Sequence, residues 1–130
     1  MTPDPVVCVI DDDVSVLRAV SRLLTALGYT VQSFKSAQQF LERPAEDDSE
    51  VGCLVLDVHM PGMSGLELQE ELARSGRDLP IVFVTGAADE TLKQRAYSSG
   101  ALDFLEKPFT DSSLERAVRY ALTCRTGRFA

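Results

Sequence analysis

Polar residues suited to phosphoryl transfer follow four apolar runs of this sequence. The run VVCVI is followed by Asp11 and Asp12, CLVL by Asp57, IVFV by Thr85, and DFLE by Lys107. Ligands bind beyond the carboxyl ends of the strands in an open parallel sheet. We therefore expect these five side chains to converge on one pocket.

Carboxylates crowded into such a pocket repel one another and raise their own pKa values unless a cation lies among them. Aspartate carboxylates and carbonyl oxygens are hard ligands, and neither a cysteine nor a pair of histidines accompanies them. This ligand set favours Mg²⁺ or Mn²⁺ over zinc. Lys107 adds a second positive charge to the same pocket.

The elements that must position these residues alternate along the chain. Short apolar runs predict strands near residues 6–10, 30–34, 52–56, 81–84 and 102–105, and amphipathic stretches predict helices near 14–27, 36–43, 65–75, 89–99 and 111–123. Five βα repeats of this kind indicate a buried parallel sheet with helices on both faces. Ser36 with Gln39, and Ser64 with Glu67, have capping-box spacing at two of the helix starts.

The length and composition narrow the class of protein. A chain of 130 residues with 45% hydrophobic and 25% charged residues is typical of one soluble globular domain. No apolar run approaches the length of a membrane span, and the start MTPDPVV lacks the features of a signal peptide, so we expect a cytoplasmic protein without membrane contact. The net charge of −7 argues against direct nucleic-acid binding by this chain.

Three further features of the sequence receive simple structural interpretations. Cys8, Cys53 and Cys124 have no metal-like spacing, and we expect them to act as small hydrophobic residues. The acidic stretch 44–50 is interpreted as a solvated connecting loop. The last residues, from 123 to 130, lose the helical periodicity and are expected to form a frayed end or the start of a linker.

Four motifs together resemble the receiver domains of two-component response regulators. They are IDDD at 10–13, LDVHMPGMSG at 56–65, VTGA at 84–87 and EKPF at 106–109. The resemblance runs from about Val6 to Leu122 and implies a flavodoxin-like (βα)5 fold, a doubly wound α/β architecture whose five parallel strands have the order 2-1-3-4-5. It divides the chain into a receiver domain, 1–124, and a tail or linker, 125–130.

The resemblance assigns Asp57 as the phosphoacceptor. It implies that Mg²⁺ is held by the carboxylates of Asp12 and Asp57, by the backbone carbonyl of His59, and through water by Asp11. Asp13 then becomes a helix N-cap. A relay or general-base role for the His59 side chain is disfavoured, because only its carbonyl is needed at this position.

The remaining site residues are also implied by the resemblance. Lys107 is expected to meet Asp57 in the resting state and a phosphoryl oxygen afterwards. The bond between Lys107 and Pro108 is expected to be cis. Thr85 and Phe104 form a switch pair, in which the Thr85 hydroxyl swings toward the phosphoryl group and leaves space for the aromatic ring.

The implied function is signalling, with a sensor histidine kinase as the phosphoryl donor. The module would catalyse only its own phosphotransfer and slow autodephosphorylation. FixJ/NarL-type regulators are most similar, and they join a receiver to a helix-turn-helix DNA-binding domain that this chain lacks. We therefore expect either a stand-alone receiver or a piece of a transcriptional regulator.

Two alternatives remain beside this interpretation. A phosphohydrolase of the haloacid-dehalogenase type also uses an Asp nucleophile, Mg²⁺, a Thr and a Lys. Such enzymes carry a DxD motif at the first strand, whereas Val58 and His59 follow Asp57 here. A degenerate receiver that never accepts phosphate is disfavoured because every expected side chain is present.

The surface formed by the fourth helix, the fifth strand and the fifth helix carries charges of both signs. Such a patch is self-complementary and suits a two-fold contact. We therefore expect a weak, salt-sensitive homodimer that forms on phosphorylation. The charged residues are Asp89, Glu90, Lys93, Arg95, Asp103, Glu106, Glu115, Arg116 and Arg119.

Overall fold

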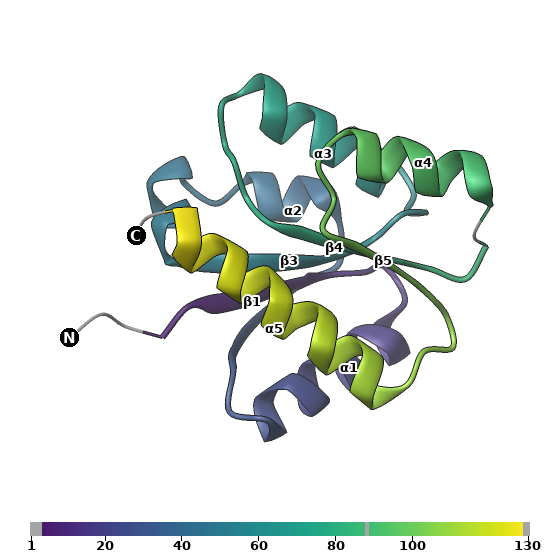
Figure 1. The fold of residues 1–130 in the computed structure, drawn as a ribbon. Coiled ribbons are helices and arrows are strands. Elements are labelled where there is room, and N and C mark those ends of the chain that lie inside the picture. The colour runs from purple at the N-terminus through teal and green to yellow at the C-terminus, as the bar shows by residue number, and fades with distance from the viewer. Residues whose placement is uncertain (1–3, 88, 129–130) are drawn as a thin grey trace.

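The computed structural model describes residues 4–87 and 89–128 and contains one five-stranded sheet. All neighbouring strands are parallel, and their order is β2-β1-β3-β4-β5. This order confirms the predicted flavodoxin-like fold (Figure 1). The strands are β1 (Val6–Ile10), β2 (Thr30–Phe34), β3 (Val51–Asp57), β4 (Ile81–Thr85) and β5 (Asp103–Glu106).

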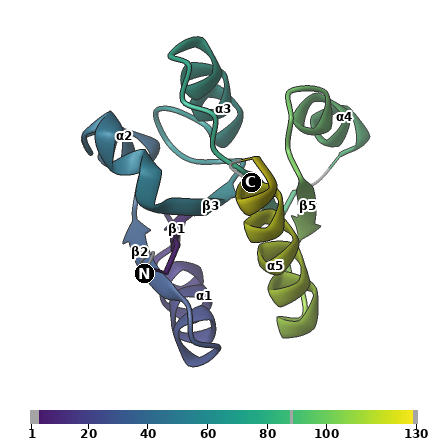
Figure 2. The same ribbon diagram turned by 60° about the vertical axis from the view of Figure 1, so that its left-hand side comes forward.

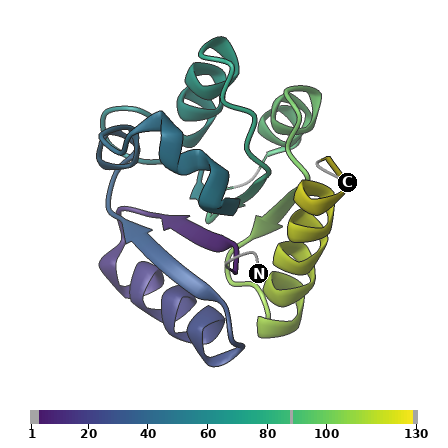
Figure 3. The ribbon, with the colours of Figure 1, turned by 90° about the vertical axis from the view of Figure 1, so that its left-hand side faces the viewer.

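Helices cover both faces of the sheet. Helices α1 and α5 lie on one face, and α2, α3 and α4 lie on the other (Figures 2 and 3). The helices are α1 (Val14–Ala26), α2 (Ala37–Leu41), α3 (Gly65–Arg74), α4 (Glu90–Ser98) and α5 (Asp111–Arg128), and a 3₁₀ helix, η1 (Ala45–Glu50), precedes β3. None of the helices in these described ranges is long and apolar enough to cross a membrane.

The sheet separates two hydrophobic cores because successive strand residues point to opposite faces. Cys8 belongs to the core beneath α2 and α3, whereas Cys53 belongs to the core beneath α1 and α5. Both thiols are free and buried, as predicted, and burial raises their pKa values to about 11 and about 12, respectively. Strands β1, β3 and β4 are buried along their whole length, which fixes the sheet rigidly at its centre.

Side-chain caps start the helices close to the predicted positions. The Asp13 carboxylate accepts hydrogen bonds from the backbone N–H groups of Ser15 and Val16, so its predicted capping role is confirmed. Ser64 and Glu67 form a complete capping box at the start of α3. These caps define where the loops after β1 and β3 end.

Two predictions about irregular segments differ from the structure. The acidic stretch 44–50 has no buried residue, as expected of a solvated connection, but it contains η1 rather than an irregular loop, and Asp48 accepts two hydrogen bonds from Arg77 at 2.7 and 2.9 Å. Helix α5 continues to Arg128, five residues past its predicted end. Residues 129 and 130 of the predicted tail lie outside the described residues.

Candidate functional site

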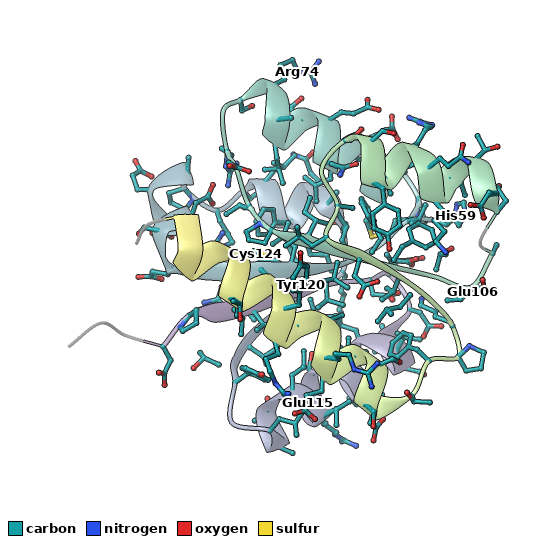
Figure 4. The ribbon with its side chains drawn as sticks, in the orientation of Figure 1. His59, Arg74, Glu106, Glu115, Tyr120 and Cys124 are labelled. Atoms are coloured by element: carbon teal, nitrogen blue, oxygen red, sulfur yellow. The ribbon has the colours of Figure 1, made fainter. Side chains whose placement is uncertain are left out.

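The candidate site lies where the strands end. Asp11 follows β1, Asp57 is the last residue of β3, and Lys107 follows β5. Parallel pairing brings these ends to the same edge of the sheet, with Asp57 beside Val84 of β4. Figure 4 shows His59 and Glu106 at this end. The predicted convergence therefore follows directly from the strand register.

Three carboxylates gather at this edge. Asp11, Asp12 and Asp57 each offer an oxygen atom, and these atoms all lie within 4.8 Å of one another. Asp11 and Asp57 are only 2% and 5% exposed, whereas Asp12 is exposed. The cluster thus has two buried members and one that faces solvent, which leaves it accessible from one side.

Lys107 forms ion pairs with this cluster. Its Nζ atom lies 2.9 Å from Asp11 Oδ2 and 3.8 Å from Asp57 Oδ2. Its hydrogen bond goes to Asp11, and its contact with Asp57, the partner expected from the sequence, is the longer of the two ion pairs. The other Asp11 oxygen, Oδ1, accepts the backbone N–H of Asp13 at 2.9 Å. Asp11 therefore has partners for both oxygens.

Asp57 is less well compensated than Asp11. Its Oδ1 accepts the backbone N–H of His59 at a long 3.3 Å. Burial and, next, the negative charge of Asp11 raise the pKa of Asp57 to about 6, against smaller opposing effects of Lys107 and the His59 N–H. One ammonium group facing three carboxylates leaves the site with excess negative charge.

The loop after β3 shapes one wall of the site. Gly65 is needed there, because a Cβ atom at this position would lie 2.3 Å from the carbonyl oxygen of Asp57. The backbone N–H of Gly65 donates to Val58 O at 2.9 Å, which ties the start of α3 to the end of β3. Gly62 has a φ of 76°, which glycine adopts at little cost. The sequence PGMSG therefore holds the backbone around Asp57 and His59.

An open pocket of about 460 Å³ lies over the carboxylates. Its lining consists of Asp12, Asp13, Val16, Asp57, His59, Gly86, Ala87 and Lys107. Val16 was not among the site residues expected from the sequence; it packs partly against the core beneath α1 and α5 and, one helical turn from the Asp13 cap, also lines the pocket. That spacing is the signal that would have identified it.

Thr85 and Phe104, the predicted switch pair, are both buried. The Thr85 side chain is fully buried, and its Oγ1 accepts the Ala87 N–H at 3.1 Å. Phe104 is 8% exposed and packs against Phe83, with the ring centroids 6.3 Å apart. The ring is therefore already inside, whereas the sequence interpretation had it enter space that Thr85 vacates.

The chain around Lys107 is fixed by its backbone. The Lys107 N–H donates to the carbonyl oxygen of Thr85 at 2.7 Å. The peptide bond between Lys107 and Pro108 is cis. The Lys107 side chain is 20% exposed, so its ammonium group reaches both the buried carboxylates and the pocket.

Comparison with known proteins identifies the family. The sequence model of one protein family, described as the response regulator receiver domain, matches residues 7–119. This chain belongs to that family. The response regulator protein TmoT of Ectopseudomonas mendocina is 42% identical over 119 residues, which cover 92% of this chain and 53% of TmoT. The transcriptional regulatory protein FixJ of Azorhizobium caulinodans is 44% identical over 114 residues, covering 88% of this chain and 53% of FixJ.

Solved structures give the same answer for the fold. The response regulator StyR matches with a TM-score of 0.88 and 42% identity, over 97% of this chain and 63% of that one. The structure of FixJ-N matches with a TM-score of 0.81 and 33% identity, over 94% of this chain and 96% of that one. The chain is a receiver domain of the two-component type, and it spans about half the length of the curated relatives named above.

Proposed function

We propose that the chain accepts a phosphoryl group on Asp57 from a sensor histidine kinase and passes the signal on through a change in its surface. The observation that carries this proposal is the burial of Asp57 beside two further carboxylates and a single lysine. The raised pKa and the incomplete charge compensation of this carboxylate suit it to bind a cation and to accept a phosphoryl group.

The donor set of the cluster fits Mg²⁺ or Mn²⁺. Asp11, Asp12 and Asp57 supply carboxylate oxygens, and the His59 carbonyl supplies a neutral one, which are the hard ligands that these ions prefer. Asp12 and Asp57 would bind the ion directly, and Asp11 through water. A bound divalent cation would neutralise charge on the phosphoryl oxygens and the carboxylates.

The residues of the chain have distinct parts in the transfer. An Asp57 oxygen attacks the phosphorus atom of a phosphohistidine, the new O–P bond forms as the N–P bond breaks, and the released imidazole nitrogen takes a proton from solvent. The ammonium group of Lys107 already lies within 4 Å of Asp57, and it would contact a phosphoryl oxygen there as a point charge. The exposed His59 side chain and the small residues Gly86 and Ala87 leave the pocket open to the donor.

Thr85 is the proposed sensor of the phosphoryl group. Its hydroxyl would turn to donate to a phosphoryl oxygen and release the Ala87 N–H that it now accepts. The segment between β4 and α4 would then rearrange. Phe104, already buried against Phe83, would adjust its packing beneath α4 rather than enter from outside.

The surface made by α4, β5 and α5 is the proposed output. Arg119 and Glu115 form an exposed ion pair on α5, and Tyr97 and Tyr120 are 41% and 54% exposed. We propose that phosphorylation favours a weak, salt-sensitive homodimer through this face. Light scattering with and without a beryllofluoride mimic, at low and high salt, tests the dimer, and an unchanged monomer in every condition would contradict it.

The wider context follows from the relatives, several of which are named as transcriptional regulators. We propose that residues 1–124 act as the receiver and residues 125–130 as a tail or linker, with transcriptional output through a DNA-binding domain outside this chain. This chain would not bind nucleic acid directly. We propose that the receiver works in the cytoplasm, where a kinase that uses ATP would find its substrate.

The test of the proposed function is phosphorylation by a small donor. In the presence of Mg²⁺ and acetyl phosphate, we expect intact-mass measurement to show one added phosphoryl group that is stable in acid and labile in base. Asp57→Asn removes the acceptor and should abolish this gain, whereas Glu71→Ala, a change on the exposed side of α3, should leave it intact. Undiminished labelling of Asp57→Asn would sink the assignment.

A further inference from the structure

We propose that the groove between α1 and β2 binds a small organic phosphate, a ligand with at least two negative charges on an apolar or aromatic body. The groove has a volume of about 600 Å³. It is lined by α1 and by residues in and just after the edge strand β2, and these two elements lie side by side (Figure 3). Its lining comprises Val14, Leu17, Arg18, Ser21, Arg22, Thr25, Ala26, Ser33 and Lys35. The volume is within the range of small-molecule sites.

Three cations meet in this groove, although the chain carries a net charge of −7. Arg18 and Arg22 stand one turn apart on α1, and Lys35 comes from the chain just after β2. Within the described ranges, none of the three forms an ion pair. By contrast, ion pairs hold the cationic side chains of Arg43, Arg74, Arg77, Arg95, Lys107 and Arg119.

The fold brings these cations together on one flank. The side chains of Leu17, Val20 and Leu24 bury one stripe of α1, which turns the arginines away from the core. On β2, Val31 packs in the core beneath α1, so Ser33, two residues further, shares that face of the strand. Like charges one helical turn apart repel each other, so their placement weakens the helix unless an anion neutralises them.

A second feature of the groove points to a ligand with hydrogen-bond acceptors. Ser21 lines the groove, and its hydroxyl oxygen is buried without a hydrogen-bond partner among the described residues. Thr25 and Ser33 add two further hydroxyl groups to the lining. Hydroxyl and guanidinium donors around one hollow match the several acceptor oxygens of a phosphate better than the two of a single carboxylate.

The apolar part of the lining indicates more than an inorganic ion. Val14 is 45% exposed, and it lies in the groove with Leu17 and Ala26. Such side chains contact the body of a ligand while the cations hold its charged end. This ligand class separates the groove from the Asp57 pocket, whose carboxylates repel anions unless a metal ion is present.

The test is a titration of the whole chain with ADP, followed by amide NMR shifts in buffer containing EDTA. EDTA removes divalent cations and so prevents recruitment of ADP to the Asp57 pocket. We expect saturable shifts in residues 14–26 and 33–35, with affinity that falls as salt is added. Pyrophosphate should bind the same residues more weakly, because it has no apolar body.

Substitutions make the assignment specific. We expect Arg18→Gln and Arg22→Gln to weaken ADP binding by about tenfold each, since each removes a charge-assisted hydrogen bond. Arg74→Gln is the matched control, because Arg74 is an exposed arginine on α3, and its variant should bind as the parent does. Lys107→Ala should also bind ADP normally, which keeps this test independent of the phosphoacceptor proposal.

Three results would overturn the proposal. One is an Arg18→Gln/Arg22→Gln double variant with the affinity of the parent chain. Another is a set of ADP shifts confined to the residues around Asp57, or the absence of any saturable shift. The third is binding of a hexaglutamate peptide to the groove with no binding of ADP, which would assign the cations to an acidic protein segment.

Discussion

The acidic cluster at the carboxyl edge of the sheet and the arginine cluster before β3 and β4 contain the same kinds of group in opposite proportions. In the first, Lys107 is the one cation that forms an ion pair with the three carboxylates, Asp11, Asp12 and Asp57, among the residues that the structure describes. In the second, Arg43 and Arg77 share Asp48, at 3.7 and 2.7 Å. Both arginines also lie over the ring of Phe40, at 5.2 and 5.8 Å from its centroid.

The two clusters differ in how completely their charges are satisfied. Arg77 donates hydrogen bonds to both oxygens of Asp48. This hydrogen bonding raises the pKa of Arg77, so it stabilises the charged guanidinium group. At Asp57 the pKa is raised instead, because burial and Asp11 oppose the ionised form. The charges of the Asp48 cluster are paired, although Arg43 Nη1 has no hydrogen-bond partner among the described residues, and this pairing stabilises the fold. The acidic cluster keeps excess negative charge, which a bound cation can neutralise.

The largest expected effect on stability is at the Asp48 cluster. Asp48→Ala leaves two arginines, whose side chains are 12% and 13% exposed, without their carboxylate. We expect a loss of about 3–5 kcal/mol in the free energy of unfolding, measured with urea. Glu71→Ala breaks the exposed ion pair with Arg74 and should change stability by about 0.5 kcal/mol or less. A loss at Asp48 as small as that at Glu71 would erase the contrast between the clusters.

Removal of a carboxylate from the acidic cluster should raise the free energy of unfolding rather than lower it. The folded-state pKa of Asp57, about 6, lies above its ordinary value of 3.8, so its contribution to stability is fully present below pH 3.8 and is lost as the pH rises through 6. Without metal at neutral pH, Asp57→Asn should therefore stabilise the fold by up to about 3 kcal/mol. Urea unfolding across this pH range measures the gain relative to wild type. A variant that is less stable than wild type at neutral pH would show that Asp57 is already satisfied.

The smallest expected effects separate two neighbouring aspartates. Asp13→Ala removes the cap of α1 and should cost about 1 kcal/mol of stability without loss of Mg²⁺ affinity. Asp12→Ala should leave the stability of the metal-free protein within about 0.5 kcal/mol and strongly weaken Mg²⁺ binding. Calorimetry reports the binding, since the chain has no tryptophan. Equal losses of affinity in the two variants would mean that the metal ligands are wrongly assigned.

The sequence predicted the acidic cluster well because its residues directly follow apolar strands. Strand ends meet through backbone pairing alone, so Asp11, Asp57 and Thr85 needed no knowledge of side-chain packing. The arginine cluster could not be predicted in this way. Asp48 lies in η1 and Arg77 in the loop between α3 and β4, 29 positions apart, and no repeating pattern connects them.

Finer features of the site also depend on packing. The hydrogen bond of Lys107 to Asp11 rather than Asp57 depends on side-chain rotamers at a crowded edge. The burial of Phe104 reflects the space beside Phe83, which a sequence pattern does not give. The extension of α5 to Arg128 occurs without the amphipathic periodicity that the prediction required.

The central claim is that the acidic cluster is short of positive charge and that a divalent cation supplies it. Unfolding at neutral pH with increasing Mg²⁺ tests this most directly. When free Mg²⁺ exceeds its Kd tenfold, wild type should gain about 1.4 kcal/mol of stability. Asp57→Asn should gain much less, and Asp48→Ala, although weakened, should gain as much as wild type. A wild-type protein indifferent to Mg²⁺, or an equal gain in Asp57→Asn, would contradict the claim.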